Sequence, residues 1–123
     1  MKKILISILN FPWSIVGIIL AFIFLPTGIN NLNHNFFAFI INVKRVWLIE
    51  IFYGKQIRGV TLGNVILLSN MADETTIKHE LVHLKQFINS PFVFPFFYFI
   101  ELARYGYKEN IYEIEARKLT NNL

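Results

Sequence analysis

The residues best suited to chemistry in this chain form the sequence His79-Glu80-Leu81-Val82-His83. On a helix, residues four apart lie about 40° apart around the axis, so His79 and His83 point into the same space. Two imidazole nitrogens about 2 Å from a common point suit a tetrahedral zinc ion. Glu80 lies about 100° round from His79, where its carboxylate can reach a water molecule beside the ion. The motif therefore predicts a zinc site with Glu80 as a general base.

A helix that starts after Asp73 is expected to position this motif. Asp73 can cap the first turn, and the sequence Asn-Ser-Pro at 89–91 ends the helical pattern. Gln86 falls on the same side as the two histidines. The apolar residues of the helix fall on the opposite side: Ile77, Leu81, Leu84 and Ile88. The face with potential ligands and the face for core packing are therefore opposite each other.

A catalytic zinc site needs a third protein ligand, and a last predicted helix over residues 110–119 offers carboxylates. The chain has no cysteine, which excludes thiolate ligands. Glu113 is the first choice, because Ala116 on the same face lets the two helices approach closely. Glu115 stays open as the third ligand. Glu113 can instead pair with Asn110 in a capping box, which would be a purely structural role.

The segments HELVHLKQ at 79–86 and NIYEIEAR at 110–117 resemble the gluzincin group of zinc metallopeptidases. They are most similar to small bacterial members with an HExxHxxQ helix and a downstream ExEA helix. The resemblance implies one zinc ion held by His79, His83 and Glu113. It also implies hydrolysis of a peptide bond by a zinc-activated water, with the motif glutamate as the general base.

The resemblance raises expectations about three further parts of the site. The strand before the motif, residues 65–69, would be the edge along which a peptide substrate lies extended. Many gluzincins carry an acidic residue four positions after the ligand glutamate, and this chain has Arg117 there. No downstream histidine is left to stabilise an oxyanion. The candidates for that role are tyrosines and an arginine, and we take Tyr105 as the first choice over Tyr98, Tyr107 and Arg104.

The fold class expected from these elements is α+β. Residues 45–53 and 59–69 are predicted strands, with a hairpin turn near Gly54 and Gly59 between them and a bend at Gly63. Together with an N-terminal transmembrane or interfacial helix, the HExxH helix and the C-terminal ligand-bearing helix, they make a minimal zincin.

Residues 4–25 contain no charged side chain and reach about 33 Å as a helix, enough to cross a bilayer. A single membrane anchor is the leading interpretation. Two alternatives remain: a cleaved signal peptide, and a helix or bent pair that lies in the interface with a break at residues 10–12. We therefore expect a membrane localisation, single-pass or interfacial, with the side left open.

The sequence therefore predicts that the chain is divided into three parts. Residues 1–26 form the membrane anchor, residues 27–35 a polar linker, and residues 36–123 a minimal zincin-like metallopeptidase domain. His34 lies in the linker, where a histidine is usually solvated. Residues 91–102 are apolar but too short to cross a bilayer, so we expect an interfacial segment there.

Lys2 and Lys3 supply half of the net charge of +4, and residues 26–123, with ten basic and eight acidic residues, are nearly balanced without a basic block. Nucleic-acid binding is therefore not expected. The expected function is a membrane-associated zinc metallopeptidase whose partners are the lipid bilayer and a membrane-proximal peptide or protein substrate; the oligomeric state stays open. Two alternatives remain: a non-catalytic, metal-stabilised membrane protein or interaction module, and a membrane-structural, holin-like protein with a chance motif.

Overall fold

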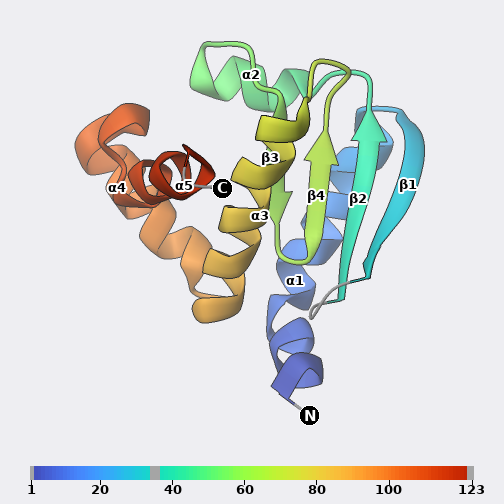
Figure 1. The fold of residues 1–123 in the computed structure, drawn as a ribbon, viewed down its shortest axis with the longest axis horizontal. Coiled ribbons are helices and arrows are strands. Elements are labelled where there is room, and N and C mark those ends of the chain that lie inside the picture. Colours follow the sequence, from blue (N-terminus) through green and yellow to red (C-terminus); the bar gives the residue numbers. More distant parts are fainter. Residues whose placement is uncertain (1, 34–36, 122–123) are drawn as a thin grey trace.

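A computed structural model describes residues 2–33 and 37–121, which form five helices and a four-stranded mixed sheet (Figure 1). This architecture confirms the predicted α+β class. Along the chain the elements are α1 (Lys2–Ile23), β1 (Pro26–Asn33), β2 (Phe37–Val43), α2 (Trp47–Tyr53), β3 (Gly59–Leu62), β4 (Val65–Leu68), α3 (Glu74–Asn89), α4 (Phe94–Glu109) and α5 (Ile111–Asn121).

The strands lie in the order β1-β2-β4-β3, so β3 is an edge strand and β4 is internal. β4 is parallel to β2 and antiparallel to β3, with which it forms a hairpin. All four residues of β4 are buried, as expected for an apolar strand covered on both faces. The expectation that residues 65–69 offer a free edge is therefore wrong, because β3 covers that edge.

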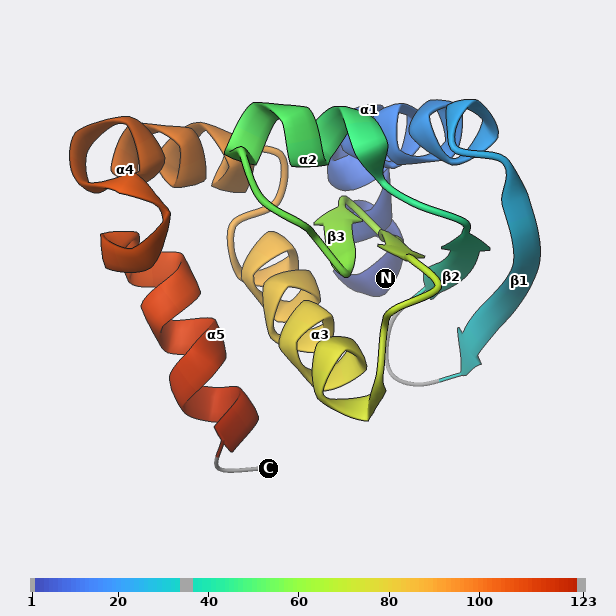
Figure 2. The ribbon, with the colours of Figure 1, turned by 90° about the horizontal axis from the view of Figure 1, so that it is seen from above.

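Helices cover both faces of the sheet (Figure 2). On one face, α1 and α2 form a core with buried side chains that include Ala21, Phe24, Ile41, Val43, Val65 and Leu67. On the other face, α3 packs through a smaller cluster around Ile66, Leu68 and Leu84. Alternate residues of β4 thus point into the cores on opposite faces of the sheet. The apolar stripe that the sequence predicts for the HExxH helix is the part of α3 that packs against the sheet.

Helix α1 is long and apolar enough to cross a membrane over Ile4–Ile23, and it is also a layer of the fold. Asn10 is fully buried: its side chain donates to the Phe87 carbonyl (3.2 Å) and accepts from the Phe92 amide (2.9 Å). The Ser14 hydroxyl accepts from the Asn64 amide in the β3–β4 turn (2.9 Å). The helix is continuous through Pro12, so the break considered at residues 10–12 is not present.

The predicted strand at 45–53 is instead helix α2. Its β-branched and aromatic residues favour a strand, but burial follows a helical period that leaves Trp47, Leu48, Ile51 and Phe52 exposed. Gly54 ends the helix in the left-handed region at φ 71° and donates to the Glu50 carbonyl. The predicted hairpin between this segment and residues 59–69 is therefore wrong. The hairpin lies within 59–69 and turns at Gly63, where a bend was expected.

The structure also assigns two segments whose secondary structure the sequence left open or predicted differently. Most of the expected linker at 27–35 belongs to strand β1, which pairs with β2 from Pro26 to Asn33. His34 falls outside the described residues. Most of the apolar segment at 91–102 forms the first part of α4, with Pro95 in the first turn, where a proline is tolerated.

Candidate metal centre

Helix α3 presents the HExxH motif as the sequence predicts. Asp73 caps the helix by accepting a hydrogen bond from the Thr76 amide (2.9 Å), and the Thr76 hydroxyl accepts from the Asp73 amide. His79, Glu80 and His83 form a group that could hold a metal ion, with ligand atoms within 4.8 Å of one another.

The carboxylate of Glu113, on α5, meets both histidines. Its Oε1 lies 3.0 Å from Nε2 of His79 and 3.1 Å from Nε2 of His83. The two Nε2 atoms are 3.2 Å apart. Three potential ligand atoms from three side chains therefore lie at the corners of a nearly equilateral triangle. Glu80 also has a carboxylate oxygen within 4.8 Å of a nitrogen of each histidine.

Local structure explains why Glu113 points into the site. Asn110 caps α5 by accepting from the Tyr112 amide (3.0 Å), which leaves the Glu113 carboxylate free of the capping box considered from the sequence. Ala116 is fully buried on the same face and allows α5 to lie close against α3. Glu115, the alternative ligand, points instead to the side chain of Gln86.

Gln86 determines which nitrogen of His83 faces Glu113. Its amide Nε2 donates to the Tyr112 carbonyl (3.0 Å) and to the Glu115 carboxylate (2.8 Å), so its Oε1 must be the atom 2.7 Å from Nδ1 of His83. Nδ1 of His83 therefore carries a proton and donates it, which turns Nε2 toward His79 and Glu113. Gln86 thus orients the imidazole ring of His83, while the side chain of Arg117 donates to the Lys108 carbonyl.

Glu80 is buried between α3 and the edge strand. Its Oε2 accepts a hydrogen bond of 2.7 Å from the hydroxyl of Thr61, which is also 3.2 Å from the backbone carbonyl of Glu80. Burial raises the pKa of Glu80 above its ordinary value. Thr61 was not predicted, because only the pairing of β3 with β4 brings this strand residue to the motif.

The charges of the site are strongly coupled. Burial opposes protonation of His83, but the hydrogen bond to Glu113 and the charges of Glu80 and Glu113 outweigh it and raise the pKa of His83 to about 9. Burial also opposes ionisation of Glu113, yet hydrogen bonds from His79, His83 and Tyr98 hold its pKa well below the usual range. Glu113 is therefore a carboxylate whose negative charge is balanced by the groups around it.

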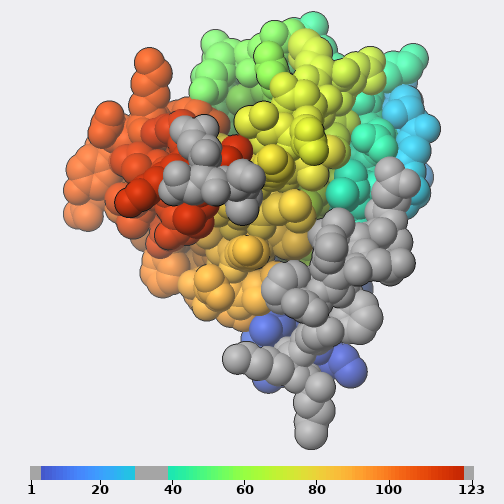
Figure 3. Space-filling view, viewed as in Figure 1, coloured from blue at the N-terminus to red at the C-terminus, as the bar shows by residue number. Residues whose placement is uncertain are grey.

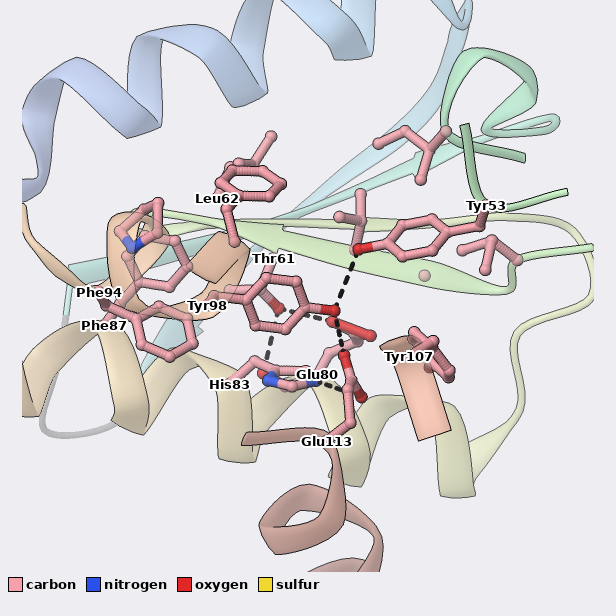
Figure 4. Close-up of a pocket in the computed structure, with 16 residues that line it drawn as sticks. Tyr53, Thr61, Leu62, Glu80, His83, Phe87, Phe94, Tyr98, Tyr107 and Glu113 are labelled. Atoms are coloured by element: carbon pink, nitrogen blue, oxygen red, sulfur yellow. Dashed lines mark hydrogen bonds and ion pairs between the residues drawn. The ribbon is translucent and has the colours of Figure 1, made fainter. Parts of the chain in front are cut away.

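A cavity of about 100 Å³ adjoins these residues. Figure 4 shows Glu80, His83 and Glu113 on one side of it, with Leu62 on the side nearer α1 and Phe87 and Phe94 together at one end. The Tyr98 hydroxyl donates to Oε2 of Glu113 (2.5 Å). That volume holds several water molecules, so a small group of a larger ligand can fit.

The structure places the residues that the sequence suggested as donors to an oxyanion in different surroundings. Tyr105 lies on the outer side of α4, 56% exposed, whereas Tyr98 and Tyr107 line the cavity. Tyr53 lines it too, and its hydroxyl is 3.0 Å from that of Tyr98. Burial raises the pKa of Tyr98, which stays a hydrogen-bond donor at neutral pH. Tyr53 was missed because its segment was predicted to be a strand.

Comparison of the chain with protein-family models, with curated proteins and with solved structures finds no match.

Proposed function

We propose that this protein is a membrane-associated zinc metallopeptidase, a minimal zincin that hydrolyses peptide bonds. The observation that supports it most is the triangle of His79 Nε2, His83 Nε2 and Glu113 Oε1, with sides of 3.0 to 3.2 Å. Ligand atoms bound to one tetrahedral zinc ion at about 2 Å lie roughly 3.3 Å apart. Two imidazoles and one carboxylate are also a donor set typical of catalytic zinc.

The residues around this triangle have the chemistry that hydrolysis requires. A zinc ion in the site would supply Lewis acidity, which lowers the pKa of water and polarises a carbonyl group. Glu80 is buried with a raised pKa and lies next to the triangle, so it suits a general base that takes a proton and later returns it to the leaving amine. Tyr107 replaces Tyr105 as the candidate donor to an oxyanion, because the hydroxyl proton of Tyr98 is already donated to Glu113.

The edge strand β3 supports a peptide as the substrate. In the antiparallel pairing with β4, Leu62 and Val65 flank a two-residue turn, so the backbone groups of Leu62 and Val60 point toward β4. Those of Thr61 and Gly59 consequently point away from β4, toward the free edge. Both residues line the cavity, so an extended peptide that pairs with β3 would pass beside Glu80.

The first test is metal content, measured by mass spectrometry on detergent-purified protein. We expect about one zinc ion per wild-type chain. It should be lost in His83→Ala and Glu113→Ala but kept in Glu109→Ala, a matched change of an exposed glutamate near the start of α5. A wild type without zinc would refute the proposal. Loss in His83→Ala alone would remove Glu113 from the ligand set.

The second test separates catalysis from a structural metal. Glu80→Gln should keep zinc and lose roughly a thousandfold in hydrolysis of labelled casein, because the amide cannot accept a proton. Undiminished hydrolysis in Glu80→Gln would refute the role of Glu80. If the wild type binds zinc but cleaves neither casein nor a bilayer-inserted peptide, the protein is a metal-stabilised membrane module instead.

A further inference from the structure

In a surface helix of a soluble protein the large apolar side chains are buried, whereas in α1 most of them are exposed. Its buried positions carry small or polar side chains: Asn10, Gly17 and Ala21. Its exposed positions carry large apolar ones, among them Phe11, Ile15, Ile18, Ile19, Phe22 and Ile23. A helix in water buries its apolar stripe, whereas a helix in lipid can pack through small residues and expose large ones.

The same kind of surface continues over two other helices. In α2 the exposed side chains are Trp47, Leu48, Ile51 and Phe52. At the start of α4 they are Phe96, Phe97, Phe99 and Ile100. Figure 2 shows α4, α2 and the C-terminal half of α1 along one side of the molecule. We call the exposed apolar residues of these three helices the apolar face. Contiguous exposed apolar faces of this kind mark sites of contact with a membrane or a partner.

The charges around this face indicate a lipid surface rather than a protein partner. Arg45 and Lys55 flank α2, and Arg104 and Lys108 follow the apolar part of α4, all with exposed side chains. Acidic residues share this margin, because Glu50 pairs with Arg45 and Glu101 and Glu109 lie on the same part of α4. The side seen in Figure 3 differs, because α3 and α5 lie there with exposed charges of both signs, among them Glu74, Lys85 and Lys118. A face without charged side chains, with charged residues at its margin, suits hydrocarbon bordered by polar headgroups.

The cavity of the metal centre reaches the apolar face. Phe99 lines the cavity while 48% of it is exposed, and Ile49 and Leu62, which also line it, are only partly buried. The hydroxyls of Tyr53 and Tyr98 meet between α2 and α4, just inside this opening.

We propose that the apolar face inserts into one leaflet of a bilayer, with α1 as part of that face, and that the cavity opens between α2 and α4 toward the acyl chains. The occupant of the face is lipid. This placement differs from a single anchor with a separate domain, because α2 and α4 also enter the membrane. It does not depend on metal or on catalysis.

The two tryptophans provide the test, since Trp13 lies on α1 and Trp47 on α2. The probe is the full-length protein in vesicles of phosphatidylglycerol and phosphatidylcholine brominated on its acyl chains. Emission of Trp13→Phe reports Trp47, and emission of Trp47→Phe reports Trp13. We expect both to be quenched. Quenching of Trp13 alone would mean that only α1 is inserted, and quenching of neither would mean that protein covers the face; either result would overturn the proposal.

A charge placed on the face gives an independent measurement. Ile51→Glu should lower binding to unbrominated vesicles of the same composition about tenfold or more, measured by flotation, because a carboxylate is expelled from hydrocarbon. Ile111→Glu is the matched control on α5, since Ile51 is 72% exposed and Ile111 is 54% exposed. Equal flotation of both variants would contradict the insertion of α2.

The opening of the cavity is tested with a phospholipid that carries a photoreactive group on its acyl chain. Phe87 and Phe94 are almost fully buried and line the cavity. Labelling of these two residues is the expected result, because an acyl chain can reach them only by entering the cavity. Labelling confined to exposed residues such as Ile51 and Phe96 would show that the cavity is closed to the bilayer.

Discussion

Gln86 is the residue whose role is defined most sharply by its hydrogen bonds. Its amide links the Nδ1 proton of His83 to two acceptors on α5, the Tyr112 carbonyl and the Glu115 carboxylate. We expect Gln86→Leu to weaken zinc affinity roughly 10- to 100-fold in a chelator competition, because His83 loses its orienting acceptor. Glu115→Gln is the control, since its amide oxygen still accepts from Gln86. Unchanged affinity in Gln86→Leu would contradict the role.

The protonation of His83 predicts how zinc binding depends on pH. In the metal-free protein His83 has a pKa of about 9, raised by Glu113 and Glu80 against the effect of burial. A zinc ligand must be a neutral imidazole, so below that pH zinc competes with a proton. Apparent affinity should therefore rise about tenfold per pH unit between pH 6.5 and 8.5. Chelator competition over that range is the measurement, and a flat profile would contradict the prediction.

At the scale of elements, the contact between α1 and the β3–β4 turn is close enough to require glycine. Gly63 has a φ of +59°, and a Cβ there would lie 2.5 Å from the Ser14 hydroxyl and 2.7 Å from the Asn10 carbonyl. We expect Gly63→Ala to lower the free energy of unfolding by about 2–4 kcal/mol. Gly54→Ala is the control: its φ of +71° is similar, but no atom lies within 4 Å of the added Cβ. Equal losses of unfolding free energy in Gly63→Ala and Gly54→Ala, measured by denaturant unfolding, would mean that α1 does not pack closely against the turn.

At the scale of the whole molecule, α1 is a structural layer, so the rest of the chain should not fold without it. Removing residues 1–25 uncovers the sheet face whose core includes Ile41, Val43, Val65 and Leu67. We expect a truncated chain to lose its cooperative thermal transition, because this apolar surface returns to water or detergent. A cooperative transition close to that of the full chain, followed by circular dichroism in the same detergent, would support a separable anchor instead.

Local patterns in the sequence predicted the elements that carry the candidate metal centre. The period of Ile77, Leu81 and Leu84 and the cap at Asp73 depend only on neighbouring residues, and both α3 and its motif follow from them. The helix that carries Glu113 was also predicted within two residues, with Asn110 as its cap. Such features involve contacts within about one helical turn, which a sequence displays directly.

The tertiary structure decided which residues from distant parts of the chain contact these elements. Residues 45–53 have strand-forming residues but become a helix, because one side of the segment packs on the core while the other stays exposed. The hydrogen bonds of Thr61 with Glu80, of Tyr98 with Glu113 and of Gln86 with α5 join residues 15 to 29 positions apart. No local pattern specifies such pairs.

By itself, the sequence determined the α+β class, the HExxH helix and an N-terminal helix without charge after Lys3, because residue spacing and composition are local properties. Only the tertiary structure decided that Glu113 faces both histidines and that α1 is a layer over the sheet. It also brought the exposed apolar sides of α1, α2 and α4 to one side of the molecule. These outcomes depend on how distant segments pack together, which requires the whole chain to fold.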